Sequence, residues 1–340
     1  MVTIKDVAKR AGVSIAAVSY ALNNKEGVNE ATKVRIKQIA EEMGYIPNSL
    51  AQGLLSKKTN IIGVLIPDIS NTYTSNFIKY LDIYARKNGF FLLLGSLVNS
   101  TDSEMDVLDK LIAKKVDGFI ITPSSYDSIV YKNIADKLNK RGIPFLFSNL
   151  SFPTIKSSFI VPDLEDGEYQ ITKYLLDEGF KDLVFVNGKK GNYYSDIRYL
   201  GFLRAHEEHG IKSEESNYIE CGNEFDFRAG YNLVGEFLKT RKLPEVFVAL
   251  NDVIAYGIIK GLKELGIKVP EDVGVVGFDD IDAFAIDTVP LTTVRIPIEE
   301  IAKLCIETIK DSSEQKVFKQ FILATELVVR DSAKFTRMTD

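Results

Sequence analysis

The chain has 340 residues, of which 45% are hydrophobic and 26% charged, so it is too long for one compact core and too apolar to be disordered. It contains no run of about 18 apolar residues, which excludes a membrane-spanning helix, and its first residues lack a secretory signal pattern. Only two cysteines, Cys221 and Cys305, are present, so neither a disulfide framework nor a metal knuckle is expected. These features predict a cytoplasmic protein of two or three domains.

The net charge of −5 is distributed unevenly along the chain. Residues 1–60 hold nine of the 42 Lys and Arg and five of the 47 Asp and Glu, a local charge of +4. The remaining 33 basic and 42 acidic residues give −9. A basic segment on an acidic body concentrates the attraction for phosphate at one end. The pattern favours nucleic-acid binding by the first 60 residues.

Helix signals begin at the third residue. Thr3, followed by Asp6, matches a capping box, and Gly12 is placed to end the helix. Ser14 and Asn29 are placed to cap a second and a third helix, and Gly44 to end the third. The apolar residues fall at helical spacing and predict one buried face on each helix: Ile4, Val7, Ala8 and Ala11, then Val18, Ala21 and Leu22, then Ile36, Ile39, Ala40 and Met43.

Two short helices joined by a tight glycine-containing turn, and braced by a third helix, predict a helix-turn-helix. The second helix would enter the major groove of DNA with a face that has few hydrogen-bonding groups. Ile15 and Ala16 suit thymine methyl groups, while Ser19 and Tyr20 could reach base edges or phosphates. A plain three-helix bundle with an incidental apolar patch is the alternative.

These segments closely resemble the headpiece of the LacI/GalR family of bacterial repressors. The resemblance rests on residues 2–8 (VTIKDVA), 11–14 (AGVS), 18–19 (VS), 22–23 (LN), 44–48 (GYIPN) and 51–52 (AQ), and on residues 326–330 (ELVVR) near the C-terminus. It implies a DNA-binding transcriptional regulator, and most often a repressor of carbohydrate utilisation. One departure is Tyr20, because the family usually has an arginine there, so the usual base contact cannot be transferred.

The resemblance also implies three domains: a headpiece over 1–46, a hinge helix and linker over 47–59, and a two-lobed effector and dimerisation domain over 60–340. The hinge is too short to be stable alone in water, so it would fold on DNA or on a partner hinge, with Leu54 as a wedge in the minor groove. A flexible linker with a stray leucine is the alternative. The expected DNA-binding residues are Thr3, Ser14, Ile15, Ala16, Ala17, Ser19, Tyr20, Asn23, Tyr45, Asn48, Ala51 and Leu54.

The rest of the chain alternates short apolar runs with amphipathic segments, which is typical of parallel strands buried on both faces. Together with chain crossings expected near residues 162, 290 and 320, this predicts an α/β domain of two doubly wound lobes, similar to sugar-binding proteins of the periplasmic type I fold. The strand-like runs are 61–66, 90–97, 116–122, 144–149, 159–162, 183–187, 246–251 and 273–278.

Polar residues follow several of these runs, and ligands of such folds bind beyond the carboxyl ends of the strands. Carboxylates, amides and one guanidinium around an aromatic face suit a sugar ring. Matching to the related sugar-binding proteins implies these effector-binding residues: Asn71, Tyr73, Asp163, Arg198, Phe225, Asn251 and Asp279. Asp252 and Asp280 are expected to support the structure. Lys189 and Lys190 leave a phosphorylated sugar open as the effector, and a purine is a further alternative.

No motif indicates catalysis, a cofactor or a metal. His206 and His209 lie on a polar helix end, and glycine-rich nucleotide loops and nucleophile elbows do not occur. We therefore expect no enzyme activity; a sugar-transport component and a dinucleotide-fold enzyme are the rival readings. Only about ten polar residues follow Arg330, so a homodimer without a tetramerisation helix is expected. Two-fold symmetry then predicts a palindromic operator in double-stranded DNA and no membrane partner.

Overall fold

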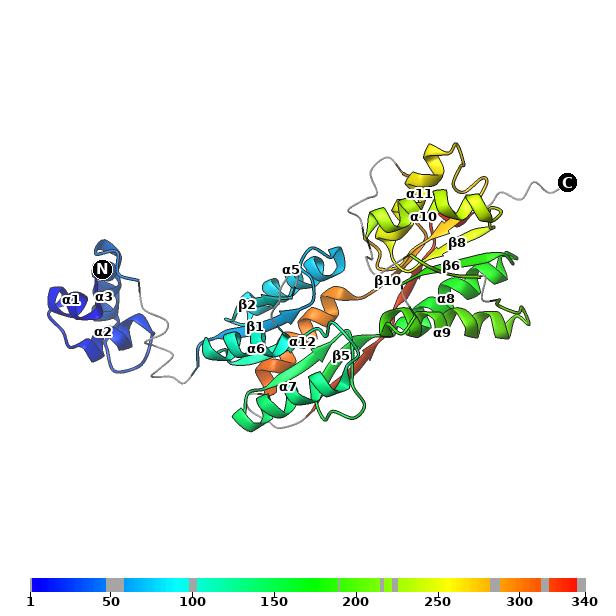
Figure 1. Ribbon diagram of the computed structural model, residues 1–340. Coiled ribbons are helices and arrows are strands. Elements are labelled where there is room, and N and C mark those ends of the chain that lie inside the picture. Colours follow the sequence, from blue (N-terminus) through cyan, green and yellow to red (C-terminus); the bar gives the residue numbers. More distant parts are fainter. Residues whose placement is uncertain are drawn as a thin grey trace. The chain divides into compact units, whose positions relative to one another are not determined.

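The computed structural model describes residues 2–46, 58–97, 103–188, 190–214, 217–221, 226–281, 288–312 and 318–334 (Figure 1). The chain divides into two compact units, Met1–Thr59 and Asn60–Asp340. None of the helices in the described ranges is long and apolar enough to cross a membrane. The predicted hinge residues Asn48, Ala51 and Leu54 lie outside the described residues.

The first unit contains the three predicted helices, α1 (Ile4–Ala11), α2 (Ile15–Leu22) and α3 (Glu30–Glu42). Their predicted faces meet in a small core, because alternate turns of each helix carry short apolar side chains that allow close approach. The fully buried core residues are Val7, Ala8, Ala11, Val18, Ala21, Ile36 and Ala40.

Local signals fix the ends of these helices. The Thr3 backbone N–H and hydroxyl both donate to the Asp6 carboxylate, at 2.9 and 2.7 Å. Gly12 adopts φ 65°, a left-handed conformation that allows the chain to turn sharply between α1 and α2. Arg35 on α3 donates from Nη2 to the Ala11 carbonyl at 2.6 Å, which ties α3 to the end of α1. The turn that presents α2 is therefore held from both sides.

The second unit begins with a lobe built on a six-stranded parallel sheet, here called the first lobe. Its strand order is β11-β5-β4-β3-β1-β2. The strands are β1 (Ile61–Ile66), β2 (Phe91–Ser96), β3 (Gly118–Ile121), β4 (Phe145–Ser148), β5 (Ser158–Pro162) and β11 (Gln320–Leu323), and the helices are α5 (Thr72–Lys87), α6 (Glu104–Ala113), α7 (Ser128–Arg141) and α12 (Ile298–Ser312).

Side-chain alternation along β1 shows how both faces of this sheet are buried. Ile62, Val64 and Ile66 belong to the same core as α5 and α12, whereas Leu65 belongs to the core of α6 and α7. Successive side chains of a strand point to opposite faces, so a continuous apolar run is required where helices cover both. The expectation of buried parallel strands is confirmed for β1, β3, β4 and β5, whereas β2, at the edge of the sheet, is mostly exposed or half-buried.

The second lobe is built on a four-stranded parallel sheet in the order β7-β6-β8-β9. Helices α8 and α9 pack on β6 in one core, while α10 and α11 pack with β8 in the other. The strands are β6 (Leu183–Asn187), β7 (Tyr218–Glu220), β8 (Val246–Ala249) and β9 (Gly274–Val276), and the helices are α8 (Leu164–Asp177), α9 (Tyr193–Glu208), α10 (Phe227–Thr240) and α11 (Asp252–Glu264).

Three chain segments connect the lobes. The chain leaves the first lobe between β5 and α8, returns between β10 (Thr293–Arg295) and α12, and leaves again between β11 and β12 (Glu326–Val328), ahead of the short helix η3 (Asp331–Ala333). β10 and β12 form an antiparallel pair, seen beside the lobe junction in Figure 1. The crossings lie close to the three expected positions, and the two-lobed α/β fold is confirmed. The predicted strand runs did not include β7, β10 or β11, which have only three or four residues each.

Candidate DNA-reading helix and effector cleft

Helix α2 presents the face that the sequence predicts for DNA. Ile15 and Tyr20 are 45% and 44% exposed, and Ala16 is exposed beside them. Ala17 and Ser19 are half-buried. The uncovered part of these side chains is not used in packing within the unit. The exposed surface of α2 is thus available for contact with another molecule.

The remaining headpiece residues of the prediction have structural partners as well. The Ser14 hydroxyl accepts a hydrogen bond from the Ala17 N–H at 3.1 Å and caps α2. The Asn23 amide donates to the Ser19 carbonyl at 2.8 Å. Tyr45 is half-buried against the headpiece core, and Thr3 is engaged in the capping box. These residues position α2 at least as much as they extend its surface.

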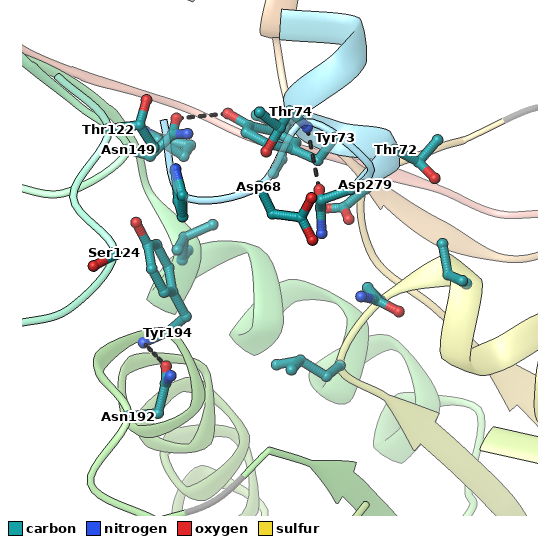
Figure 2. Close-up of a pocket in the computed structure, with 18 of the residues that line it drawn as sticks. Asp68, Thr72, Tyr73, Thr74, Thr122, Ser124, Asn149, Asn192, Tyr194 and Asp279 are labelled. Carbon is teal, nitrogen blue, oxygen red and sulfur yellow. Dashed lines mark hydrogen bonds between the residues drawn. The ribbon is translucent and has the colours of Figure 1, made fainter. Parts of the chain in front are cut away.

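A cavity of about 690 Å³ lies between the two lobes of the second unit. Figure 2 shows side chains converging on it from strand ends and helix starts. The first lobe contributes Pro67, Asp68, Ser70, Asn71, Thr72, Tyr73, Thr74, Thr122, Pro123, Ser124, Asn149 and Pro162, and the rest of the wall is Leu164, Asn192, Tyr194, Arg198, Asp226, Leu250, Asn251, Val253, Asp279 and Ile296.

The parallel sheets explain this convergence, because the carboxyl ends of their strands meet at the same edge. Asn149 directly follows β4, and Asp279 comes three residues after β9. Their φ angles are 66° and 112°, in a region where Asn and Asp are found more often than other side chains. The Tyr73 hydroxyl donates to Asn149 Oδ1 at 2.6 Å (Figure 2). This bond joins the walls contributed by β4 and α5.

Two of the predicted ligand residues cap helices at the cavity edge. Asn71 Oδ1 accepts from the Thr74 N–H at 3.1 Å, and Asn251 Oδ1 accepts from the Ile254 N–H at 2.8 Å. The oxygen of each amide is therefore committed to its helix. Asp163 is also a cap, for α8, with its Oδ1 3.0 Å from the Asp166 nitrogen. Unlike the two asparagines, Asp163 is not part of the cavity wall.

Arg198 is 6% exposed and lies in the wall of the cavity. Its Nη1 donates to the Leu250 carbonyl, its Nη2 lies 3.6 Å from Asp279 Oδ1, and its guanidinium carbon is 3.9 Å from the Phe278 ring centroid. Its Nε is buried and has no hydrogen-bond partner among the described residues. A buried guanidinium donor without a partner is costly, so a ligand atom that accepts from it would remove a penalty.

Burial dominates the electrostatics of this wall. It raises the pKa of Asp279 to about 6, although the nearby Arg198 guanidinium lowers that pKa. Burial also lowers the pKa of Arg198, against the effect of Asp279 and Glu168. Arg198 is the only cation in the described wall, which also contains Asp68, Asp226 and Asp279. The cavity is therefore unfavourable for an anionic ligand and suits one rich in hydroxyl groups.

Other residues from the sequence prediction lie elsewhere. Phe225 and Lys189 are outside the described residues. Lys190 is not part of the cavity wall, and its Nζ lies 5.0 Å from the centre of the Tyr218 ring. The wall also contains polar residues that the prediction missed, among them Asn192, Tyr194 and Asp226. Asn192 and Asp226 precede helices and cap them, a signal that the sequence does contain.

The residues expected to be structural have structural contacts. Asp252 accepts from the Thr293 hydroxyl at 2.6 Å and from the Ile281 N–H at 2.7 Å. Asp280 pairs with Arg295 and Arg330, at 2.7 and 2.6 Å. Both carboxylates fasten the segment after β9 and do not belong to the cavity wall. The segment that carries Asp279 is thus anchored at the two positions that follow it, Asp280 and Ile281.

The two histidines of α9 bond within the fold. The Nδ1 atoms of His206 and His209 lie 2.9 and 2.8 Å from the Phe202 and Ala205 carbonyl oxygens, and His209 Nε2 lies 3.0 Å from Asp177 Oδ1. Within the described ranges there is no group of three or more His, Cys, Asp and Glu side chains that could hold a metal ion.

Comparisons with known proteins agree with this architecture. Residues 3–48 match the family described as bacterial regulatory proteins, lacI family, and residues 172–333 match the periplasmic binding protein-like domain. The HTH-type transcriptional repressor PurR of Vibrio parahaemolyticus is 30% identical over 98% of this chain and 99% of its own length.

Two solved structures are similar as well. A lac repressor dimer bound to operator and the anti-inducer ONPF is 24% identical, with a TM-score of 0.86 over 98% of this chain and 99% of that one. A LacI-family regulator of Enterococcus faecium with bound ribose is 27% identical, with a TM-score of 0.70 over 80% and 98%. The matched proteins are transcriptional regulators and not enzymes. This chain therefore belongs to the LacI family of bacterial regulatory proteins, and it is a DNA-binding regulator of transcription.

Proposed function

We propose that the regulator responds to a small neutral sugar bound in the cleft, and that this binding changes the affinity of paired headpieces for a palindromic operator. The observation that carries the proposal is the cavity wall, in which three carboxylates and four asparagines surround one paired arginine. The proposal assigns residues 1–46 to the headpiece, 47–59 to the hinge and 60–340 to the effector and dimerisation domain.

The chemistry of the wall supports a sugar because hydroxyl groups both donate and accept. Asp68, Asp226 and Asp279 offer acceptors for ligand hydroxyls, and the Arg198 Nε offers a buried donor. Tyr73 and Tyr194 supply aromatic surface for the C–H face of a ring. A phosphorylated ligand would meet the carboxylates without a second cation in the described wall. The proposed effector residues are Asn71, Tyr73, Arg198, Phe225, Asn251 and Asp279, and Asp163 supports them from the cap of α8 beside the wall.

At the other end of the chain, the exposed face of α2 supports insertion into the major groove. The proposed DNA-binding residues are Thr3, Ser14, Ile15, Ala16, Ala17, Ser19, Tyr20, Asn23, Tyr45, Asn48, Ala51 and Leu54. A lac repressor of the same fold is a dimer on its operator, which supports a homodimer here, and a relative that holds ribose supports a sugar effector. Because DNA is the target, we place the function in the cytoplasm.

The binding of the effector and the binding of the operator are linked by a single coupling free energy. A sugar that weakens operator binding must be weakened by the operator to the same extent, and such coupling is typically about 1–3 kcal/mol. This reciprocity holds whether the sugar induces or corepresses. It makes the proposal measurable from either ligand.

The test is a thermal-shift screen of the full-length protein against neutral mono- and disaccharides, sugar phosphates and purines. A sugar present at a hundred times its Kd adds about 2.7 kcal/mol, or roughly 5 °C for a domain of this size. The hit is then tested on Asp279→Asn and on the matched control Asp82→Asn. Asp82 is a carboxylate of α5 that pairs with Arg86 outside the cavity.

A neutral sugar that stabilises the wild type and the control, but not Asp279→Asn, supports the proposal. Stabilisation only by phosphates or purines would contradict the sugar assignment and leave the assignment to DNA intact. A sugar that stabilises Asp279→Asn as strongly as the wild type would mean that it binds outside this cleft.

A further inference from the structure

Aromatic rings form a continuous series from the core of the first lobe to the start of α9 in the second lobe. Consecutive ring centroids are 4.9, 5.4, 4.9 and 5.7 Å apart. The rings are, in order, those of Tyr131, Phe152, Tyr126, Tyr193 and Tyr194. Only the third contact in this series, between Tyr126 and Tyr193, joins one lobe to the other.

The Tyr126–Tyr193 contact has the geometry of a stacked pair. The ring planes are 11° from parallel, and a centroid distance of 4.9 Å corresponds to offset stacking. Tyr126 lies between β3 and α7 and is 46% exposed. Tyr193 is the first residue of α9, and it also packs against the first-lobe core formed by α6 and α7. Each of the two rings therefore contacts one aromatic ring of the other lobe and one aromatic ring of its own lobe.

On the first-lobe side, Tyr126 has firm support. Its ring stacks on Phe152, which is 3% exposed. Two residues earlier, the Ser124 N–H donates to the Tyr131 hydroxyl and the Ser124 hydroxyl donates to Glu104, both at 2.7 Å. Since Tyr131 is fully buried, the loop that carries Tyr126 moves with the first lobe.

On the second-lobe side, Tyr193 is fixed by the start of α9. The Asn192 side chain accepts from the Tyr194 N–H at 3.0 Å (Figure 2). The Asn187 amide, at the end of β6, donates to the Ser195 carbonyl at 2.9 Å. Tyr193 thus moves with β6 and α9, and separation of the lobes must break its stack on Tyr126.

Neither stacked tyrosine lines the cavity, but their neighbours in sequence do. Ser124 precedes Tyr126 by two residues, and Asn192 and Tyr194 flank Tyr193. Ser124, Asn192 and Tyr194 all line the cavity, and Figure 2 shows them on the same side of the view. A ligand that holds these walls together also keeps the two rings stacked.

We propose that Tyr126 and Tyr193 form a clasp that holds the two lobes closed and so slows the release of the cleft ligand. The inference rests on the proposed function only in taking the cleft as the ligand site. An aromatic pair of this kind changes the ratio of closed to open protein by roughly 2- to 10-fold. The apparent ligand affinity of the protein falls by up to the same factor when the clasp is lost, because a smaller fraction of the protein is closed.

The first experiment needs no ligand. Because the chain contains no tryptophan, an introduced indole is the only one in the protein and can report on the stack. In full-length Tyr126→Trp protein, the single indole reports on the stack through its emission maximum and its quenching by acrylamide. Adding Tyr193→Ala is expected to shift the emission to longer wavelength and to increase quenching. The matched control adds Tyr231→Ala, which removes a tyrosine that bonds to Glu264 on the far side of the second lobe. Identical spectra with and without Tyr193 would overturn the clasp.

A second measurement separates lobe closure from local packing. Small-angle scattering of the ligand-free Tyr126→Ala and Tyr193→Ala proteins is expected to give a larger radius of gyration than the wild type. The double variant should expand no more than either single variant, since one contact is lost in all three. Curves that superimpose on the wild type would show that the rings touch without holding the lobes.

The third measurement uses D-ribose, D-glucose and maltose as probes. For any of them that binds the wild type, Tyr126→Ala should weaken binding by roughly 2- to 10-fold through faster dissociation. Unchanged dissociation would overturn the clasp. If none of the three binds the wild type, the sugar assignment loses support, while fluorescence and scattering still decide whether the clasp exists.

Discussion

Arg198 and Asp279 form an ion pair in the wall of the cleft, with Nη2 3.6 Å from Oδ1 and both residues less than a tenth exposed. One residue comes from α9 and the other from the segment after β9. A buried pair gains little stability after the cost of desolvation. Arg198 is held independently by the Leu250 carbonyl and the Phe278 ring. We propose that the pair serves as a preorganised donor and acceptor for a ligand.

This pair predicts how effector binding depends on pH. Burial raises the pKa of Asp279 to about 6, so the carboxyl is mostly protonated below that pH. An ionised Asp279 is the better acceptor for sugar hydroxyls, and affinity should rise through pH 6 and level off above about pH 7. At pH 5 binding should be roughly tenfold weaker than at pH 7. Calorimetric titration of the sugar between pH 5 and pH 7 measures this rise in affinity. The Asp279→Asn protein should bind the sugar weakly at every pH.

Glu168 on α8 predicts a pH dependence of folding stability. It is 1% exposed, accepts from the Thr172 hydroxyl, and burial raises its pKa from 4.5 to about 8, against the lowering effect of Arg198. A raised carboxyl pKa stabilises the protonated folded state, so this contribution is fully present below about pH 4.5 and is lost as the pH rises through 8. The loss is roughly 5 kcal/mol.

Urea unfolding between pH 5 and 9 measures this contribution. Glu168→Gln should make the free energy of unfolding flatter over that range and larger than wild type at pH 9. A surface control, Glu236→Gln, removes a carboxylate that pairs with Lys239 in solvent and should retain the wild-type slope. An equal slope in wild type and Glu168→Gln would contradict the assignment.

Close approach of α10 and α11 makes a third prediction. A Cβ on Gly230 would lie 2.1 Å from the Ile254 carbonyl oxygen, whereas a Cβ on Gly235 of the same helix would meet nothing within 4 Å. Gly230→Ala should destabilise the protein by about 1–3 kcal/mol because the backbones must separate. Gly235→Ala should be neutral or stabilising by up to about 1 kcal/mol. Thermal unfolding of the two variants side by side gives the comparison.

Sequence reasoning located the elements whose signals are local. The Thr3–Asp6 box, the Ser14 and Asn29 caps and the left-handed Gly12 each involve residues within one turn, so their spacing alone determines the helix ends. The buried strands were found because parallel strands covered on both faces must be continuously apolar. β11 was not predicted as a strand because it lies at the edge of the sheet, where its first three residues are exposed and the strand is not covered on both faces. β10 was not predicted as a strand because its pairing with β12 depends on tertiary structure.

The site was predictable where residues follow strands. Asn71, Arg198, Asn251 and Asp279 were expected and do line the cavity. Tyr194 was missed because its place in the wall depends on how α9 meets the first lobe, which no local spacing encodes. Asp163 follows a strand as well, but its carboxylate caps α8 and does not line the cavity, although its neighbours Pro162 and Leu164 do. Position after a strand therefore selects the correct edge of the sheet, and tertiary packing selects the residues.

The last prediction concerns how α2 reads DNA. Ile15 is an exposed apolar side chain at the start of α2, where a recognition helix contacts base edges. In a high-affinity palindrome selected from random DNA, Ile15→Ala should cost about 1–3 kcal/mol and relax preference at one base pair of each half-site, because a thymine methyl contact is lost. Val34→Ala removes a 62% exposed side chain from α3 and should leave the selected sequence unchanged.

Binding is measured at one fixed salt concentration, since phosphate contacts make all affinities depend on salt. If an isolated half-site binds as tightly as the palindrome, paired headpieces are not the reading unit; if Ile15→Ala weakens all sequences equally, its contact is to the backbone and Tyr20 or Ser19 must carry the specificity.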